Sequence, residues 1–206
     1  MDVVAIIPCR YGSKRFEGKP LIPILGQPMI QRVYERAKKA EILSDVVVAT
    51  DDERILRCVE GFGGRVLMTA RTHRSGSDRA AEAAVRLDLK DQDIVINIQG
   101  DQPALAPRSL SEVVSPLMEA PGLVMSTLIH KIRDPGEIND PKCVKCVFDQ
   151  EGFALYLSRS PIPFNRDGLE QVDTFKHLGI YAFRKHFLER FTSLPRGRLE
   201  AIEKLE

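Results

Sequence analysis

The sequence has little cysteine, with four residues in 206. A disulfide-dense scaffold needs many more, so this composition excludes that class of protein. Charge of one sign is also lacking, because 30 Lys and Arg face 29 Asp and Glu and leave a net charge of +1. Such a chain has no overall attraction for nucleic acid or for an anionic membrane. We therefore expect no nucleic-acid partner, and any anionic ligand must be bound by a local cluster of cations.

Long apolar runs are absent too. No stretch of the sequence approaches the ~18 apolar residues of a membrane span. The N-terminus carries Asp2 where a signal peptide has basic residues. We expect no membrane insertion and a cytoplasmic location. The 43% apolar and 29% charged residues are typical of globular proteins, and the length favours one domain over 1–206.

Cys143 and Cys146 form a CxxC pattern that could indicate a metal or redox site. The β-branched and aromatic residues around them predict a strand over 144–148. Residues three apart in a strand point to opposite faces, so we expect the two thiols not to share a metal ion. We interpret them as packing cysteines.

Apolar runs alternate with helical patterns along the first two thirds of the chain. Runs without strict apolar–polar alternation are typical of strands buried on both faces of a sheet. The alternation predicts right-handed βαβ units and a three-layer α/β/α sandwich with a mostly parallel, Rossmann-like sheet. Strands are expected at 3–7, 45–49, 94–98 and 124–129, and helices at 29–40, 53–61, 78–87 and 108–119.

The alternation of predicted strands and helices ends after residue 142. Shorter strands are predicted at 144–148, 154–158 and 177–183, with Pro- and Gly-containing connections between them. We interpret 142–197 as an antiparallel extension of the same sheet. Its apolar residues offer material for a dimer contact, although packing within one chain explains them as well.

A basic loop with two glycines follows the first predicted strand. Ligands of open α/β sheets bind at the carboxyl ends of strands, and glycine backbone N–H groups with Arg and Lys side chains bind phosphates. The loop is not a Walker A motif, because five residues separate its glycines and Pro20 replaces the Ser or Thr that would bind magnesium. It is interpreted as a phosphate-binding loop or, alternatively, a solvated basic loop. Its cations are Arg10, Lys14, Arg15 and Lys19.

Asp101 follows the predicted buried strand 94–98, within Gln99-Gly100-Asp101. An aspartate after a glycine is commonly a turn residue. At the carboxyl end of a strand, however, it is the best-placed carboxylate in this sequence for a magnesium ion that accompanies a nucleotide.

These motifs resemble those of the 3-deoxy-manno-octulosonate (Kdo) cytidylyltransferase family, the CMP-Kdo synthetases, which activate an acidic sugar with CTP. The resemblance covers nearly the whole chain in order. Two positions depart from the family pattern: Glu17 replaces a proline and Gln102 replaces a glutamate. The matching motifs are PCRYGSKRFEGKPL (8–21), ATDD (49–52), MT (68–69), SG (75–76), QGDQP (99–103), ALYLSR (154–159), PIP (161–163) and HLGIY (177–181).

The resemblance implies a nucleotide-diphospho-sugar transferase fold, a homodimer and a role in lipopolysaccharide synthesis. The implied reaction is attack of the sugar's anomeric hydroxyl on the α-phosphorus of CTP, which releases pyrophosphate. The resemblance assigns catalysis to Arg10, Lys19 and Asp101, and Mg²⁺ to Asp101. It places CTP at Pro8, Cys9, Arg10, Arg15, Lys19, Met68, Thr69, Ser75 and Gly76, and the sugar at Arg79, Gln99, Arg159, His177 and Tyr181.

Local patterns give some of these residues a second interpretation. Ser77 or Asp78 is expected to cap the helix that follows, and a capped helix start also presents free N–H groups to a ligand. His177 and Tyr181 are four apart, which places them on one face of a strand. His73, His130 and His186 receive no role.

Other functions stay open. Gln102, Phe164 and the segment 197–200 are similar to relatives that use 8-amino-Kdo. Another acidic-sugar cytidylyltransferase, such as a CMP-sialate synthetase, and a nucleotide- or sugar-binding protein without turnover are the alternatives.

The last predicted helix, 197–206, has no stop signal after it. Members of the family continue past this helix to a second metal-binding aspartate. We therefore expect a truncated chain that binds CTP and turns over poorly.

Overall fold

The apolar run at the N-terminus forms strand β1 (Val3–Cys9), the middle of a parallel sheet. The computed structural model describes residues 1–12, 16–169 and 172–205, and the chain divides into two units. Unit 1 consists of Met1–Ser126 and Ile180–Ser193, and unit 2 of Thr127–Gly179 and Leu194–Glu206. The single domain over 1–206 stays a prediction.

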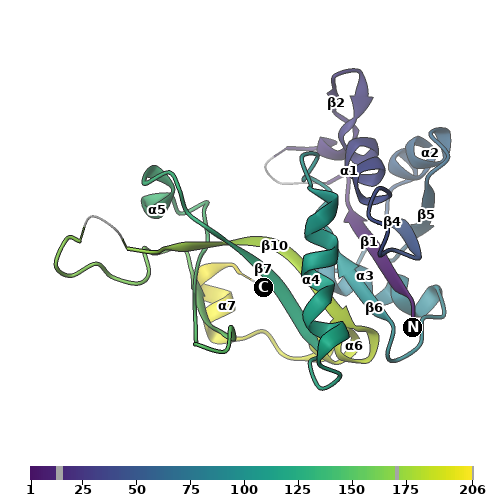
Figure 1. The fold of residues 1–206 in the computed structure, drawn as a ribbon. Coiled ribbons are helices and arrows are strands. Elements are labelled where there is room, and N and C mark those ends of the chain that lie inside the picture. The colour runs from purple at the N-terminus through teal and green to yellow at the C-terminus, as the bar shows by residue number, and fades with distance from the viewer. Residues whose placement is uncertain (13–15, 170–171, 206) are drawn as a thin grey trace. The chain divides into compact units, whose positions relative to one another are not determined.

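The sheet of unit 1 has the strand order β5-β4-β1-β6-β10 (Figure 1). Strands β4 (Asp45–Thr50), β5 (Arg65–Met68) and β6 (Ile94–Asn97) join the sheet in parallel, and the last residues of β10 (Phe175–Arg184) pair antiparallel with β6. Most residues of β1, β4 and β6 are buried. The predicted buried, mostly parallel sheet is therefore confirmed.

Helices cover both faces of this sheet. On one face, Val4, Ile6 and Val95 pack with alanines of α3 (Gly76–Arg86) and with Leu188 of α6 (Lys185–Ser193). On the other face, α1 (Met29–Ala37) contacts β4 and α4 (Pro107–Glu119) contacts β6 (Figure 1). The three-layer prediction is confirmed for unit 1.

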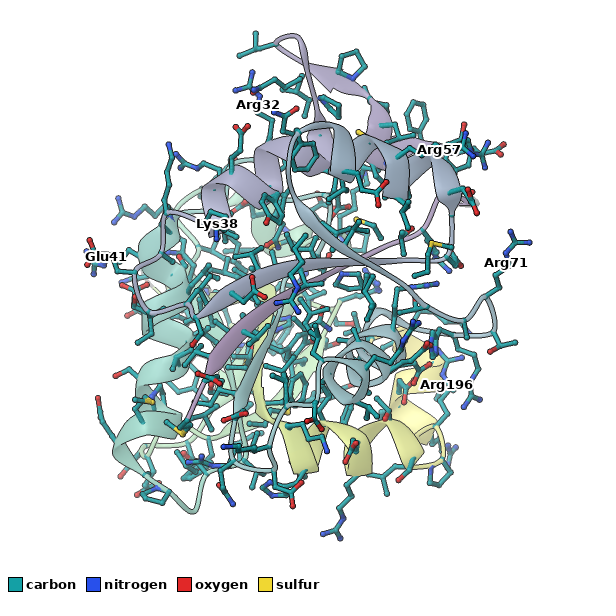
Figure 2. All side chains as sticks on the ribbon, turned by 90° about the vertical axis from the view of Figure 1, so that its right-hand side faces the viewer. Arg32, Lys38, Glu41, Arg57, Arg71 and Arg196 are labelled. Carbon is teal, nitrogen blue, oxygen red and sulfur yellow. The ribbon has the colours of Figure 1, made fainter. Side chains whose placement is uncertain are left out.

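Each outer helix turns a polar side to the solvent. Lys38 at the end of α1 and Arg57 of α2 (Glu53–Gly61) point away from the sheet (Figure 2). The apolar side chains of α1, such as Ile30 and Val33, are buried. Apolar residues that recur with the helical period of 3.6 residues lie on one face of the helix, and this face is the buried one.

Unit 2 is built around antiparallel pairing. Strand β8 (Lys145–Phe148) pairs with β9 (Ala154–Ser158) and with Phe175 and Lys176 of β10, and β7 (Met125–Lys131) also pairs with β10. The predicted antiparallel strands are therefore present. Unit 2 also contains the short helices α5 (Gly136–Asn139) and α7 (Arg198–Glu203).

Some expected boundaries were wrong. The first helix ends at Ala37 instead of residue 40, and the last ends at Glu203 with Lys204 in the left-handed conformation. The strand after residue 142 begins at Lys145. The argument that both CxxC sulfurs lie in one strand therefore fails for Cys143, although both cysteines are free thiols.

Six elements were not predicted. They are η1 (Lys19–Leu21), β2 (Pro23–Ile24), β3 (Gln27–Pro28), β5, α5 and α6. In the part of the chain that the structure describes, no helix has the length and apolar character that a membrane span requires.

Candidate functional site

A pocket lies in unit 1 where β1 ends and α3 begins. It brings together residues that are more than 60 positions apart in the chain, as the CTP assignment requires for Pro8, Cys9, Arg10, Ser75 and Gly76. Arg79, which was predicted for the sugar, lies there as well. The lining residues are Pro8, Cys9, Arg10, His73, Arg74, Ser75, Gly76 and Arg79.

Two glycines allow the backbone segments around this pocket to approach closely. A Cβ atom on Gly76 would lie 3.2 Å from Cγ of Pro8, and one on Gly100 would overlap Sγ of Cys9. The end of β1 is thus packed between the start of α3 and the loop that carries Asp101. The contact of Gly100 with Cys9 excludes a side chain at position 100, and the contact of Gly76 with Pro8 would be a tight one for a Cβ atom.

Cys9 is a packing residue at this point. Burial, with a smaller contribution from the charge of Asp101, raises the pKa of its thiol to about 12, while the charge of Arg79 opposes the shift. The thiol is protonated at neutral pH and is no nucleophile. The pocket can therefore use Cys9 only through its backbone and shape.

Helix α3 begins at Gly76, two residues earlier than expected, and the predicted cap was wrong. Ser75 is the N-cap, and its Oγ accepts a hydrogen bond from Asp78 N–H over 3.1 Å. Asp78 Oδ2 accepts one from Ser75 N–H over 3.1 Å in return. Serine with an acidic residue three positions later satisfies two backbone donors at once, which Ser77 or Asp78 as the cap would not do. The positive end of the α3 dipole therefore lies at the pocket, where it favours an anion.

Arg79 is almost fully buried beside this helix start, with 4% of its side chain exposed. Its Nη2 donates to Asp51 Oδ2 over 2.8 Å, and its Nη1 donates to Thr69 Oγ1 over 2.5 Å. The guanidinium thus links α3 to the residues that follow β4 and β5. Met68, the last residue of β5, leads into this junction. The contact of Arg79 with a sugar stays a prediction.

The basic loop brings a cation to the predicted metal ligand. Lys19 Nζ lies 2.6 Å from Asp101 Oδ2, and both side chains are about two-fifths exposed at 43% and 41%. Lys19 follows Gly18, whose φ of 70° is in the left-handed region that favours glycine. Arg15 lies outside the described residues.

Tyr11 holds the base of this loop. Gly18 N–H donates to its carbonyl oxygen over 2.9 Å, and the guanidinium carbon of Arg54 lies 3.2 Å from the centre of its ring. Arg54 in turn donates to both carboxylate oxygens of Asp52, the N-cap of α2. The hydrogen bonds from Arg54 hold the pKa of Asp52 below its usual value. A cation–π contact and an ion pair therefore fix one end of the loop.

The predicted sugar residues are divided between the units. Gln99 is exposed after β6 in unit 1, and Tyr181 is half-buried on β10, opposite Asn97. Arg159 and His177 belong to unit 2. Gly179, between His177 and Tyr181, has φ 69°.

In unit 2, the Arg159 guanidinium donates to backbone carbonyl oxygens. Nε donates to Glu203 over 2.8 Å and Nη1 to Pro141 over 2.7 Å. The Glu203 carboxylate in turn accepts bonds from Ser158 Oγ and from Arg159 N–H, which connect α7 to β9. Arg159 thus has a structural role at the end of β9, and its grip on a sugar carboxylate stays a prediction.

His177 is held in a neutral form. Its Nε2 lies 2.7 Å from Thr127 Oγ1, and burial lowers the pKa of the imidazole from 6.5 to about 4. At neutral pH the ring is uncharged, and it can donate a hydrogen bond from one nitrogen and accept one at the other.

His73 and Arg74 line the pocket although the sequence analysis gave them no role. They immediately precede the Ser75-Gly76 motif, and this adjacency is the signal that could have identified them. Among the described residues no group of three or more His, Cys, Asp and Glu side chains could hold a metal ion. A metal at Asp101 would therefore depend on the ligands that a substrate brings.

The chain is similar to known cytidylyltransferases along its length. The family described as cytidylyltransferase matches residues 4–206. A 3-deoxy-manno-octulosonate cytidylyltransferase of Desulfosudis oleivorans is 59% identical over 206 residues, which are 100% of this chain and 83% of the relative. An 8-amino-3,8-dideoxy-manno-octulosonate cytidylyltransferase of Shewanella sp. (strain ANA-3) is 53% identical over 207 residues, 100% of this chain and 84% of the relative.

A solved structure also resembles this one closely. It is a CMP:2-keto-3-deoxy-manno-octonic acid synthetase complexed with CTP, with a TM-score of 0.92 and 42% identity. The match covers 100% of this chain and 83% of that chain. Sequence and structure thus agree along the whole chain, and the protein belongs to the cytidylyltransferase family of nucleotidyltransferases.

Proposed function

We propose that this cytidylyltransferase transfers CMP from CTP to the anomeric hydroxyl of Kdo. The anomeric oxygen forms a bond to the α-phosphorus, and the bond from this phosphorus to the bridging oxygen of the β-phosphate breaks. Pyrophosphate leaves, and the hydroxyl proton is lost to the surroundings. The observation that supports this proposal most directly is the pocket between β1 and α3. Five of the nine residues predicted for CTP line this pocket, and the relatives of this chain are named for this reaction.

The pocket suits the phosphates of a nucleotide. Arg10 is exposed at the end of β1, and Arg74 lines the same pocket beside the start of α3. Two cations and a helix N-terminus supply fixed positive charge where negative charge grows during phosphoryl transfer. Fixed donors need no rearrangement in the transition state, so positioning and charge account for the rate.

Lys19 and Asp101 would act beside the triphosphate. An exposed carboxylate is a hard oxygen ligand of the kind that Mg²⁺ prefers, and Mg²⁺ commonly combines one or two carboxylates with substrate phosphates. Asp101 fits this chemistry and would hold the ion together with CTP. A bound Mg²⁺ would neutralise part of the negative charge on the phosphates. Lys19, in contact with Asp101, can donate to a phosphoryl oxygen.

The sugar is proposed to contact Gln99 and Tyr181 of unit 1. The contacts of Arg79, Arg159 and His177 with a sugar stay predictions from the resemblance. A neutral His177 suits hydroxyl groups, because it can donate from one ring nitrogen and accept at the other. We assign Kdo over 8-amino-Kdo because the relative of 59% identity is named for Kdo, and the 8-amino relative is 53% identical. The product would serve lipopolysaccharide synthesis, and the homodimer and the cytoplasmic location stay predictions.

The test is pyrophosphate release in a mixture of CTP, MgCl₂ and one acidic sugar. Kdo should give a higher kcat/KM than 8-amino-Kdo, and a sialic acid should give no release. A higher kcat/KM with 8-amino-Kdo would reassign the substrate. CTP binding without release from any of the three sugars would instead favour a binding protein without turnover.

A further inference from the structure

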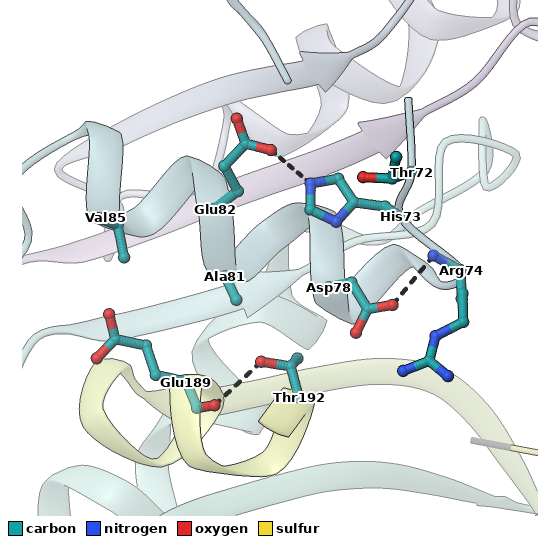
Figure 3. A pocket seen from close by; sticks show the side chains of 9 residues that line it. All are labelled: Thr72, His73, Arg74, Asp78, Ala81, Glu82, Val85, Glu189 and Thr192. Carbon is teal, nitrogen blue, oxygen red and sulfur yellow. Dashed lines mark hydrogen bonds and ion pairs between the residues drawn. The ribbon is translucent and has the colours of Figure 1, made fainter. Parts of the chain in front are cut away.

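The segment between β5 and α3 forms one wall of the proposed nucleotide pocket. The side chain of Glu82, on α3, binds this segment. Glu82 lies in the second turn of α3 and lines a neighbouring pocket with His73 and Arg74 (Figure 3). Its Oε2 accepts a hydrogen bond from Ala70 N–H over 2.8 Å and lies 2.5 Å from Nε2 of His73. One carboxylate therefore contacts the segment at two points, three residues apart.

Two side chains of α3 form hydrogen bonds with the backbone N–H and C=O groups of Ala70. Its N–H donates to Glu82, and its carbonyl oxygen accepts from Nη1 of Arg79 over 3.3 Å. Arg79 and Glu82 are three positions apart, which places them on the same side of the helix. The segment has no regular secondary structure between Met68 and Gly76, so these contacts take the place of a backbone ladder.

The charge state of Glu82 supports this role. Burial acts to raise its pKa, but hydrogen bonds from Ala70 and His73, and from Arg86, hold the pKa below its usual value. An ionised carboxylate accepts stronger hydrogen bonds than a neutral one. The side chains of His73 and Glu82 are only 17% and 25% exposed, which limits competition from water.

His73 transmits this restraint to the other pocket. Its ring contacts Glu82 on one side, and the residue lines the nucleotide pocket on the other. Arg74, Ser75 and Gly76 follow directly and line the same pocket. Because Ala70 and His73 are fixed, the residues that follow them enter α3 at a defined place.

We propose that Glu82 is a positioning residue that holds the segment 70–76 in the conformation that binds CTP. This inference rests on the proposed function, because it takes the pocket as the nucleotide site. Glu82 itself would not touch CTP. It acts through Ala70 and His73.

The experiment is a calorimetric titration of the protein with CTP in MgCl₂, together with steady-state kinetics. Glu82→Ala should raise the Kd for CTP about tenfold, because it removes the two hydrogen bonds that join the segment 70–76 to a charged acceptor. The KM for the sugar should not change, and kcat at saturating CTP should stay within about threefold of wild type, since the effect is on ground-state CTP binding. Glu189→Ala is the matched control, because Glu189 lines the same neighbouring pocket from α6 and pairs with Lys185 (Figure 3).

A merely structural role would lower the melting temperature and the fraction of active protein without changing the Kd of that fraction. Equal CTP affinity of folded Glu82→Ala and wild type would overturn the proposal. Failure of the wild-type protein to bind CTP would instead refute the proposed function and remove the premise of the inference.

A double-mutant cycle keeps the test decisive where Glu82→Ala does not fold. Glu82→Gln keeps an acceptor oxygen for Ala70 and removes the charge that faces His73, while His73→Leu removes the other partner. If Glu82 acts through His73, the double variant should lose little more CTP affinity than either single variant. Strictly additive losses, or no loss in any of the three, would contradict the proposal.

Discussion

Lys19 Nζ and Asp101 Oδ2 lie 2.6 Å apart, although the two residues are separated by 82 positions in the chain. An ion pair between side chains that are 43% and 41% exposed adds only about 0–1 kcal/mol to stability. It places a cation and a carboxylate side by side near the carboxyl ends of β1 and β6. The proposed function assigns this cation to the triphosphate of CTP and this carboxylate to its metal ion.

Asp101→Asn should abolish most turnover and leave the fold intact. Loss of a magnesium-binding carboxylate should lower kcat/KM at least about 100-fold, because metal catalysis contributes several kcal/mol of transition-state stabilisation. The measurement is pyrophosphate release over a range of MgCl₂ concentrations, with circular dichroism to confirm folding. Asp167→Asn, at an exposed position of unit 2, serves as the control. Turnover of Asp101→Asn near the wild-type rate at ordinary magnesium would show that this residue is not the metal ligand.

Gly100→Ala should damage both stability and activity. The added methyl group would overlap Sγ of Cys9, and overpacking of this kind costs about 1–3 kcal/mol. Asp101 is the next residue, so the shift that relieves the overlap should also lower kcat. Chemical denaturation and the pyrophosphate assay measure the two effects.

The cause of the Gly100 effect can be tested by a second substitution. Cys9→Ala in the Gly100→Ala background removes the overlapping sulfur. It should restore part of the lost stability and part of the lost kcat. Gly122→Ala is the control, because a Cβ atom there would meet nothing within 4 Å. Equal damage with and without the sulfur would disprove the steric explanation.

Acidification should destabilise the protein through His177. The pKa of this imidazole is about 4 in the folded protein, against 6.5 when unperturbed. The unfolded chain therefore binds a proton at His177 as the pH falls through 6.5, whereas the folded protein does so only near pH 4. The contribution of this pKa difference to the free energy of unfolding is fully present above pH 6.5 and is lost as the pH falls from 6.5 towards 4.

Nuclear magnetic resonance titration of the imidazole proton measures this pKa, and His177→Gln assigns the signal. The free energy of unfolding of His177→Gln should fall less between pH 7.5 and pH 5 than that of the wild type. A titration midpoint at 6.5 or above would show that the ring is not desolvated as the structure indicates.

The sequence predicted those elements well whose signals lie in neighbouring residues. Helix α2 begins at Glu53 and ends at Gly61 as expected, since Asp52 caps it and Gly63-Gly64 follow it. Strand β9 also has its expected bounds. Strand β5 was missed because Arg65–Met68 is only four residues long and half-exposed, so it shows no buried run.

Much of the site depends on contacts that no local pattern encodes. The ion pair of Arg79 with Asp51 joins residues 28 positions apart, and nothing near Arg79 in the sequence indicates that its charge is already paired. The same holds for Arg159, whose guanidinium donates to the carbonyl oxygens of Pro141 and Glu203. The motif sequences identified these arginines as important, but their partners are determined by the folded topology.

The most direct test of the central claim is whether this chain releases pyrophosphate from CTP when Kdo is present. The reaction should contain the purified protein, CTP and MgCl₂, with pyrophosphate and CMP-Kdo measured in the same samples. We predict one pyrophosphate for each CMP-Kdo formed, and no pyrophosphate when Kdo is omitted. Binding of CTP with no pyrophosphate released in the presence of either Kdo or 8-amino-Kdo would contradict the proposed function.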